Sequence, residues 1–326
     1  MPSTSHRHQS KSMSKSKSTS KTLLAFAIIY LVWGSTYLAI SIGVREVPPF
    51  LLAAIRFFTA GLVLFLWSLV RGEQSPTARQ WKSISLIAIL IFVIDYGLLF
   101  WAEQRVPSGM AAVVTAIIPA LMTISEIVLL KTQKLTLRLA ASLLIGFAGV
   151  AVLMSRTIPV SRSLNLPHAK IDAPIDALGA IALIIASIGW AIASSLLRKL
   201  PLPASKVVSS ASQMLAGGFF LFITAAALGE FHNFHPQNVS REAWLSLLYL
   251  IIFGSIIAFT AYVWLIHHES PTKVSTYAYV NPVVAVLLGY FLANEPLGLR
   301  TILGSALILL SVIVITTTPK PSAPHS

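Results

Sequence analysis

The segment Thr22–Val44 reads TLLAFAIIYLVWGSTYLAISIGV and contains no charged residue, while Lys21 and Arg45 lie immediately on either side of it. A helix needs about 20 mostly apolar residues to cross the hydrocarbon core of a bilayer. The apolar part of a secretory signal peptide is shorter, at roughly 7–15 residues. The segment is therefore predicted to be a helix that crosses the membrane and remains in the protein.

Charged residues divide the rest of the chain into nine further apolar segments. In order, they are Val47–Val70, Ser83–Ala102, Val106–Leu130, Leu139–Ser155, Ala177–Leu197, Val207–Gly229, Ala243–Ile266, Val274–Asn294 and Thr301–Pro319. The only charges within them are Arg56, Asp95 and Glu126. A backbone in lipid must satisfy its hydrogen bonds within its own segment, which favours helices. The sequence therefore predicts an all-α membrane protein with ten transmembrane helices.

The composition argues against a soluble domain and against nucleic-acid binding. Of the 326 residues, 56% are hydrophobic and 11% are charged, whereas soluble domains carry about 25% charged residues. The net charge is +13, but the basic residues lie in the N-terminal tail and in short loops between apolar segments, as they do around membrane spans. The chain has no cysteine, so neither disulfides nor cysteine-ligated metals are expected.

The distribution of lysine and arginine predicts the orientation in the membrane. With ten spans, both termini lie on one side. That side holds 16 of the 24 basic residues, the other side holds 7, and Arg56 lies inside a span. Basic loops stay in the cytosol, so we expect a multi-pass inner-membrane protein with both termini cytosolic. Residues 1–21 are rich in serine and lysine, which predicts a disordered cytosolic tail.

The two halves of the chain carry a weak internal repeat. An offset of 157 residues relates a Tyr-Trp-Tyr pattern in the first span to a Ser-Trp-Ser pattern in the sixth, and it also relates Arg56 to Gln213. The residues of the two patterns are Tyr30, Trp33 and Tyr37, and Ser187, Trp190 and Ser194. Residues 22–155 and 177–319 are therefore predicted to form two five-helix repeats, with an external linker at 156–176 and a cytosolic tail at 320–326. An odd number of spans per repeat inverts the second repeat, as in many secondary transporters.

Several short strings resemble a known transporter family. They are Trp33-Gly34-Ser35-Thr36-Tyr37, Val47-Pro48-Pro49 with Arg56-Phe57, Val106-Pro107-Ser108-Gly109, Gly254-Ser255-Ile256-Ile257-Ala258 and Tyr277-Ala278-Tyr279-Val280-Asn281-Pro282. Taken in this order, they resemble the drug/metabolite transporter superfamily, and within it the bacterial EamA-type ten-helix inner-membrane exporters. The resemblance implies two inverted five-helix repeats around a central cavity, and export of metabolites that are often amino-acid-like or toxic. Members often have an acidic residue after the fourth span of each repeat; Glu295 fits this pattern, but Gln133 stands at the matching place in the first half.

Candidate residues of the substrate path are aromatic or polar residues within the spans. They are Tyr30, Trp33, Tyr37, Arg56, Asp95, Trp190, Gln213, Tyr277 and Asn281. An alternative interpretation gives the aromatic residues to an interfacial belt and Asn281 to a structural bond between helices. Pro119 and Pro282 fall inside spans and are predicted to break or bend them, because proline lacks an amide hydrogen.

Arg56 and Asp95 are predicted to form a buried pair that lines the cavity. Each lies roughly 12 Å below the external boundary at a helix rise of about 1.5 Å per residue. A lone charge in the membrane costs at least ~2.5 kcal/mol, and consecutive spans are usually neighbours. A structural role is favoured because Gln213 replaces Arg56 in the second repeat, but substrate or proton binding stays open.

These features predict a secondary transporter that exports small metabolites, amino-acid-like compounds or drugs across the inner membrane by alternating access. The alternative is a channel or an uptake permease for small molecules. The sequence contains no recognisable catalytic set and no GxxxxGK phosphate loop, so neither an enzyme nor an ATP-driven pump is expected. The expected partners are a small-molecule substrate and the lipid bilayer, with protons as a candidate coupling ion and a homodimer as a candidate assembly. No cofactor, metal or nucleic acid is expected.

The charge bias makes the topology testable with reporter fusions. Fusions after Lys199 and after Lys320 are expected to report a cytosolic position, and fusions near Lys170 an external one, because basic loops resist translocation. Alkaline phosphatase and fluorescent-protein reporters measure the two outcomes. A cytosolic signal at Lys170 would contradict the ten-span topology.

Overall fold

The computed structural model of the protein describes residues 5–131, 135–155, 176–197, 199–232, 234–268, 277–295 and 297–317. Throughout these ranges the chain forms helices joined by short turns, and it contains no β-strand. The predicted all-α class is therefore confirmed. The predicted tail at 320–326 and the predicted linker, apart from Asp176, lie outside the described residues.

Seven helical stretches are long and apolar enough to cross a membrane. They are Ser20–Gly43, Pro49–Val70, Ala78–Ala102, Ser108–Leu129, Ala177–Leu196, Lys206–Ala227 and Arg241–Tyr262. Shorter apolar helices at Leu137–Val152, Val280–Ala293 and Leu299–Ser311 coincide with the fifth, ninth and tenth predicted spans. The membrane-spanning character of the described chain thus rests on seven helices, and the count of ten stays a prediction.

Single helices form most of the spans. They are α1 (Ser5–Gly43), α2 (Pro49–Val70), α7 (Leu137–Met154), α8 (Ala177–Leu196), α9 (Lys206–Ala227), α13 (Tyr277–Ala293) and α14 (Leu299–Thr317). The apolar part of α1 begins at Ser20, but the helix begins at Ser5, where the sequence predicted a disordered tail. Residues 5–19 contain no proline or glycine, so a helix nucleated by the apolar segment can propagate into them.

The third and eighth spans share an irregular middle section. The third is built from α3 (Ala78–Ala88), η1 (Ile89–Gly97) and α4 (Leu98–Ala102), and the eighth from α10 (Arg241–Tyr249), η5 (Leu250–Ile257) and α11 (Ala258–His268). Both η1 and η5 are π-helical, and this conformation is frequent at functional sites. The two spans hold corresponding positions in the predicted repeats.

The fourth span is interrupted near its middle. Two residues separate helix α5 (Ser108–Thr115) from helix α6 (Ile118–Ser125), and the π-helical η2 (Glu126–Leu130) follows α6. Pro119 is the second residue of α6, a place where a missing amide hydrogen is tolerated. Pro282, in contrast, lies inside α13, which continues through it as one helix, so the helix is not interrupted there, and a bend at Pro282 stays a prediction.

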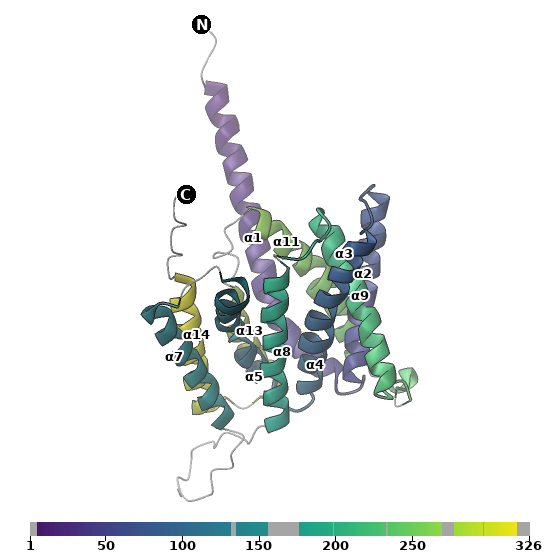
Figure 1. The fold of residues 1–326 in the computed structure, drawn as a ribbon, viewed down its shortest axis with the longest axis vertical. Coiled ribbons are helices and arrows are strands. Elements are labelled where there is room, and N and C mark those ends of the chain that lie inside the picture. The colour runs from purple at the N-terminus through teal and green to yellow at the C-terminus, as the bar shows by residue number, and fades with distance from the viewer. Residues whose placement is uncertain are drawn as a thin grey trace, which may run out of the picture.

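Two long helix pairs frame the bundle. Helix α2 packs along α9, and α7 packs along α14 at one edge of the molecule (Figure 1). Helix α1 lies against α13 and α11, while α8 lies against α6 and η1. Large apolar side chains remain exposed on the outside of these helices, among them Val63, Leu66, Leu144, Leu178 and Phe219. Such an outer surface suits contact with lipid rather than water.

Glycines set the distance between α2 and α9. A Cβ built on Gly61 would lie 2.4 Å from the backbone nitrogen of Leu215, and one built on Gly218 would lie 2.4 Å from the backbone nitrogen of Phe58. A side-chain rotation cannot relieve either contact, because backbone atoms are involved. Gly61 and Gly218 are related by the 157-residue offset, so equivalent small residues allow the two helices to approach.

Gly61→Ala is expected to lower the free energy of unfolding by about 1–3 kcal/mol, since the added methyl group meets the backbone of α9. Unfolding in detergent micelles measures this effect. Val63→Leu enlarges a side chain that is 47% exposed on the same helix and is the matched control, with an expected change within about 0.5 kcal/mol. Equal losses in the two variants would count against the close approach.

Candidate functional site

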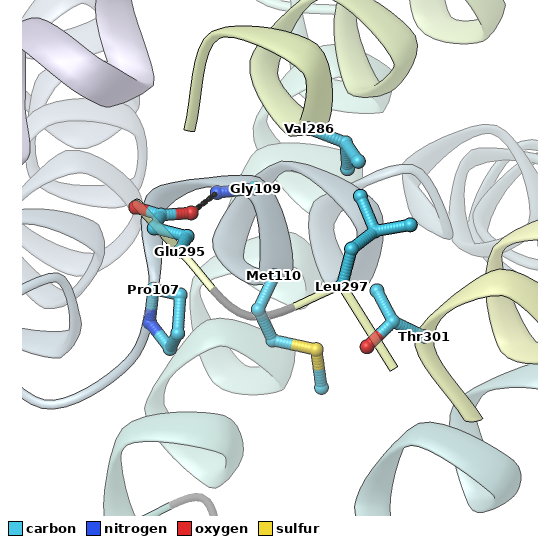
Figure 2. A pocket seen from close by; sticks show the side chains of 7 residues that line it. All are labelled: Pro107, Gly109, Met110, Val286, Glu295, Leu297 and Thr301. Carbon is cyan, nitrogen blue, oxygen red and sulfur yellow. Dashed lines mark hydrogen bonds between the residues drawn. The ribbon is translucent and has the colours of Figure 1, made fainter. Parts of the chain in front are cut away.

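A pocket lies between α5, α13 and α14 at the end of the bundle away from Ser5. We call this end the far end; it holds the turns that follow α1, α4, α9 and α13. The residues that line the pocket are Pro107, Gly109, Met110, Val286, Glu295, Leu297 and Thr301. Figure 2 shows that the carboxylate of Glu295 reaches the backbone nitrogen of Gly109 at the start of α5. Glu295 supplies the only charged group in this lining.

Glu295 caps the N-terminus of α5. One carboxylate oxygen, Oε1, accepts hydrogen bonds from the backbone nitrogen and the hydroxyl of Ser108, both at 2.7 Å. The other, Oε2, accepts a hydrogen bond from the backbone nitrogen of Gly109 at 3.0 Å. The first amides of a helix lack partners within it, and a carboxylate there also meets the positive end of the helix dipole. The contact therefore fixes the turn after α13 to the start of α5.

Two more carboxylates cap helices at the far end. Glu230, which follows α9, accepts hydrogen bonds from the backbone nitrogens of Leu51 at 2.8 Å and Phe50 at 3.4 Å. Glu46, between α1 and α2, accepts hydrogen bonds from the backbone nitrogen of Ser240 at 2.5 Å and from its hydroxyl at 2.7 Å. Sequence reasoning missed both residues, because an acidic loop residue does not identify its distant partner. The serine directly before α10 was an available signal for a capped helix start.

The surroundings of these carboxylates shift their pKa values in opposite directions. Hydrogen bonds from the backbone and then the hydroxyl of Ser240 lower the pKa of Glu46 from its usual 4.5. Burial raises the pKa of Glu230, and the hydrogen bonds from Leu51 and Phe50 oppose that rise. The stabilisation tied to Glu46 is therefore present above pH 4.5 and lost as the pH falls through the lowered pKa. For Glu230 it is complete at low pH and lost as the pH rises through the raised pKa.

An aromatic cluster joins α1 to α11 and α13. The indole of Trp33 lies 5.1 Å from the ring of Tyr262 and meets the ring of Tyr277 edge-on at 5.2 Å. Its Nε1 donates a hydrogen bond to the carbonyl oxygen of Gly254 in η5 at 3.1 Å. The three rings are only partly buried. The indole of Trp33 thus donates a hydrogen bond to a backbone carbonyl of the π-helical segment, while its ring remains partly exposed.

Asn281 and Tyr37 add polar contacts on either side of this cluster. The side-chain amide nitrogen of Asn281 donates hydrogen bonds to the carbonyl oxygens of Tyr30 and Tyr277, both at 3.2 Å. The hydroxyl of Tyr37 lies 2.8 Å from that of Thr115, the last residue of α5 before its interruption. Five of the predicted path residues, Tyr30, Trp33, Tyr37, Tyr277 and Asn281, therefore come from α1 and α13 and lie in one region.

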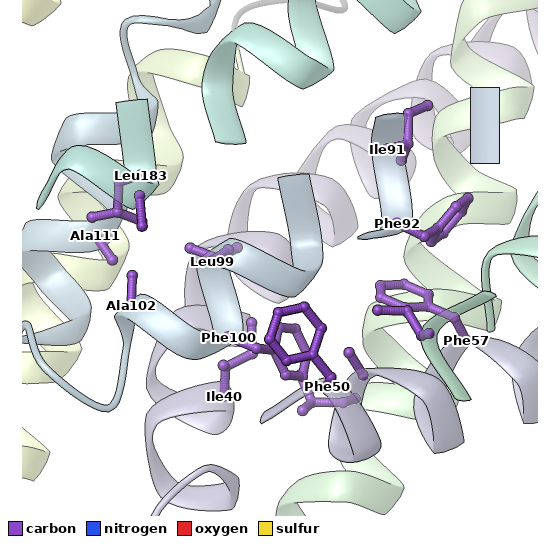
Figure 3. Close-up of a cluster of buried hydrophobic side chains, with 14 of the residues drawn as sticks. Ile40, Phe50, Phe57, Ile91, Phe92, Leu99, Phe100, Ala102, Ala111 and Leu183 are labelled. Atoms are coloured by element: carbon purple, nitrogen blue, oxygen red, sulfur yellow. The ribbon is translucent and has the colours of Figure 1, made fainter. Parts of the chain in front are cut away.

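Arg56 is enclosed by the second, third and eighth spans. Its Nε donates a hydrogen bond to the hydroxyl of Ser255 at 2.9 Å. Its Cζ lies 4.6, 5.5 and 5.9 Å from the ring centroids of Phe57, Tyr96 and Phe100, and Figure 3 shows Phe57 and Phe100 within the buried apolar cluster. The side chain is 2% exposed, and its Nη1 has no hydrogen-bond partner among the described residues. Arg56 is a buried cation that contacts mainly ring faces.

The predicted pair of Arg56 and Asp95 is wrong. Asp95 is also buried, with 5% of its surface exposed. Within the described ranges, however, the only salt bridge joins Arg105 to Asp176, at 3.2 Å. The two charged side chains are therefore both buried without forming an ion pair.

The geometry of the third span explains why the pair does not form. Arg56 faces Tyr96 and Phe100, which lie four residues apart and share one side of the span. Asp95 precedes Tyr96 by one residue, and one residue turns a helix by about 100°. The depths counted from the sequence did not specify the direction in which each side chain points around its helix. The π-helical segment η1 changes the direction of Asp95 further.

Trp190 and Gln213, the candidates from the second half, have different surroundings. The ring of Trp190 meets that of Tyr96 in η1 nearly edge-on, at 6.1 Å and 82°. Trp33 and Trp190, which are 157 residues apart, thus each contact a π-helical segment. Gln213 donates a hydrogen bond from Nε2 to the hydroxyl of Ser209 at 3.0 Å, within α9. That bond does not connect Gln213 to the aromatic cluster.

Comparison with known proteins identifies the family. The model of the EamA-like transporter family matches residues 20–155 and again residues 177–317. The chain belongs to the EamA-like transporter family. It is 38% identical to the uncharacterized inner membrane transporter YedA of Escherichia coli K12, over 90% of this chain and 89% of that protein. It is 23% identical to the uncharacterized transporter YvbV of Bacillus subtilis, over 92% and 93% of the two chains. The resemblance drawn from the short sequence strings is confirmed.

A solved crystal structure supports the fold. It aligns with a TM-score of 0.57 at 23% identity and covers 91% of this chain and 96% of that one. Within this EamA-like chain, the three carboxylate caps each join one matched region to the other. Glu46 of the first region binds Ser240 of the second, whereas Glu230 and Glu295 of the second region cap α2 and α5 of the first. The far end is therefore held together by polar contacts between the two regions.

The missing ion pair has a measurable consequence. Arg56→Ala and Asp95→Ala are each expected to destabilise the protein, and their losses in unfolding free energy are expected to add to within about 0.5 kcal/mol. Unfolding in detergent micelles provides the double-mutant cycle. A second cycle with Arg56→Ala and Ser255→Ala is the positive control, with an expected coupling on the order of 1 kcal/mol. A coupling of similar size between Arg56 and Asp95 would show that the two side chains interact, and it would contradict the absence of an ion pair.

Proposed function

We propose that this EamA-like protein is a secondary transporter that exports small metabolites, amino-acid-like compounds or drugs across the inner membrane by alternating access. Relatives that are named inner membrane transporters support transport in general. The observation that supports the finer mechanism best is the set of three carboxylate caps between the two matched regions at the far end. Such polar contacts can open and re-form without exposing an apolar core.

The proposed framework has ten spans in two inverted repeats, with both termini in the cytosol and the far end outside. Seven long and three short apolar helices match the ten predicted positions. Helices at equivalent places also pair with each other, α2 with α9 and α7 with α14. The π-helical segments η1 and η5 fall in equivalent spans. Inverted repeats of this kind support alternating access, because the two halves can exchange their conformations.

The proposed substrate path runs through the partly buried aromatic cluster. Trp33 and Trp190 contact the π-helical segments of the eighth and third spans. Tyr37 reaches the interrupted end of α5 at Thr115. Secondary transporters place substrates beside irregular helices, where backbone and side-chain dipoles face the path. Asn281, which bonds the carbonyl oxygens of Tyr30 and Tyr277, supplies a buried polar group beside this cluster.

The caps are contacts that a ligand-driven change of state can open. Glu46 is exposed, so solvent screens its hydrogen bonds to Ser240. Alternative states of one protein are commonly separated by only a few kcal/mol. Three such caps can therefore hold the far end closed, while a ligand that favours the opposite state can release them.

Growth and flux measurements test export against its alternatives. A strain that overexpresses the protein is expected to tolerate exported compounds better than a deletion strain across a panel of metabolites and drugs. Compounds found in this way are then tested for flux in proteoliposomes. Greater sensitivity of the overexpressing strain would favour uptake, and large single-channel currents in the liposomes would favour a pore.

The cysteine-free sequence allows the gate to be probed directly. We expect a cysteine introduced by Thr115→Cys, at a site that is 5% exposed, to react slowly with a membrane-impermeant maleimide added outside the cell. Adding Glu295→Ala is expected to speed this labelling several-fold, since the cap on α5 is lost. Glu242→Ala removes an exposed glutamate in the first turn of α10 and serves as the control. Equal labelling rates in both backgrounds would count against Glu295 as part of the gate.

A further inference from the structure

The guanidinium of Arg56 is held in place but largely unused as a donor. An arginine offers five N–H donors in a planar fork. The structure gives one hydrogen bond from this group, between Nε and the hydroxyl of Ser255. Rings of Phe57, Tyr96 and Phe100 lie over the group, and Nη1 lacks a partner among the described residues. The fork is therefore oriented by its surroundings, while its Nη1 makes no hydrogen bond within the described residues.

The buried carboxyl groups of Glu103 and Asp95 form no ion pair with Arg56 within the described ranges. Glu103, the residue after α4, is 5% exposed, and neither of its carboxylate oxygens has a hydrogen-bond partner in the described chain. Burial raises the pKa of Glu103 well above its usual range, the nearby Glu295 raises it further, and Arg56 opposes the rise. Asp95 is equally buried and makes no salt bridge within the described ranges. Neither carboxyl forms a salt bridge with Arg56 in the described residues, so the guanidinium has no paired carboxylate there.

Gly254 lies directly beside the guanidinium of Arg56. A Cβ at this position would lie 3.0 Å from Nη2 of Arg56 and 3.0 Å from Cγ2 of Thr36. The carbonyl of Gly254 is held by the indole of Trp33, so the backbone at this point is fixed. A side chain at position 254 would occupy the space directly beside the fork.

We propose that Arg56 binds an anionic group of the transported molecule, a carboxylate or a phosphate, at the edge of the guanidinium beside Gly254. The planar fork matches two oxygens of either group. A buried cation without a paired carboxylate gains most from a ligand that carries the opposite charge. The inference rests on the proposed transport function and specifies the chemistry of its substrate.

Binding to the purified full-length protein in lipid nanodiscs tests the site. The probes are benzoate, phenyl phosphate and the uncharged benzamide, measured by calorimetry and by the shift in melting temperature. Benzoate or phenyl phosphate is expected to bind at least 10-fold more tightly than benzamide, and the stronger of the two identifies the anionic group. Arg56→Gln is expected to abolish this preference, and Arg56→Lys to weaken it, since lysine lacks the fork.

Two further variants separate a binding role from a folding role. Gly254→Ala keeps the charge of Arg56 but crowds the fork, and it is expected to weaken anion binding several-fold. Arg105→Gln removes another arginine, one that stacks on Trp101 at 4.2 Å and pairs with Asp176, and it is expected to leave anion binding unchanged. Equal affinity for benzamide and benzoate, or wild-type anion binding by Arg56→Gln, would overturn the proposal. If proteoliposomes made with Arg56→Gln still transport a compound found in the growth panel, transport stands while the anion site fails.

Discussion

The structure depends on one constraint: a backbone in lipid must hydrogen-bond within its own helix unless another group replaces the lost partner. The chain departs from regular helix at η1, at η5 and after Thr115, and polar side chains reach the last two of these places. The indole of Trp33 binds the carbonyl of Gly254 in η5, and the hydroxyl of Tyr37 meets that of Thr115. Irregular backbone and polar side chains therefore occur together in the interior, which is where a transport path needs exposed dipoles.

Two kinds of contact join the halves of the molecule, and they differ in how they respond to motion. Between α2 and α9, glycines bring backbone against backbone at Gly61 and Gly218, so these helices cannot slide without steric conflict. At the far end, the contacts are hydrogen bonds from Ser108, Leu51 and Ser240 to carboxylates. Water can replace such bonds at modest cost. The bundle thus combines a close-packed pair that resists movement with a polar end that can separate.

The sequence predicted the helical class and the positions of the apolar helices well, because charged residues separate one apolar run from the next. It also placed Trp33, Tyr277 and Asn281 on helices that meet. It failed where three-dimensional direction matters. Depth along a helix could be counted for Arg56 and Asp95, but the direction of each side chain around its helix could not, and the π-helical turn at η1 altered that direction. The caps by Glu46 and Glu230 join residues more than 170 positions apart, and one sequence does not specify such partners.

The two halves of the chain differ in a buried charge, since Arg56 of the first half corresponds to Gln213 of the second. The scaffold repeats: Trp33 and Trp190 each contact a π-helical segment, and Gly61 and Gly218 each contact a backbone. The charge does not repeat, since Gln213 stands where the first half has Arg56 and bonds only to Ser209 in the structure as described. The sequence comparison favoured a structural role for Arg56 because of this difference, but in the structure Arg56 makes one hydrogen bond to Ser255 and its Nη1 has no partner among the described residues. A buried cation that occurs in only one half of a repeated framework is therefore consistent with a site for a single bound ligand.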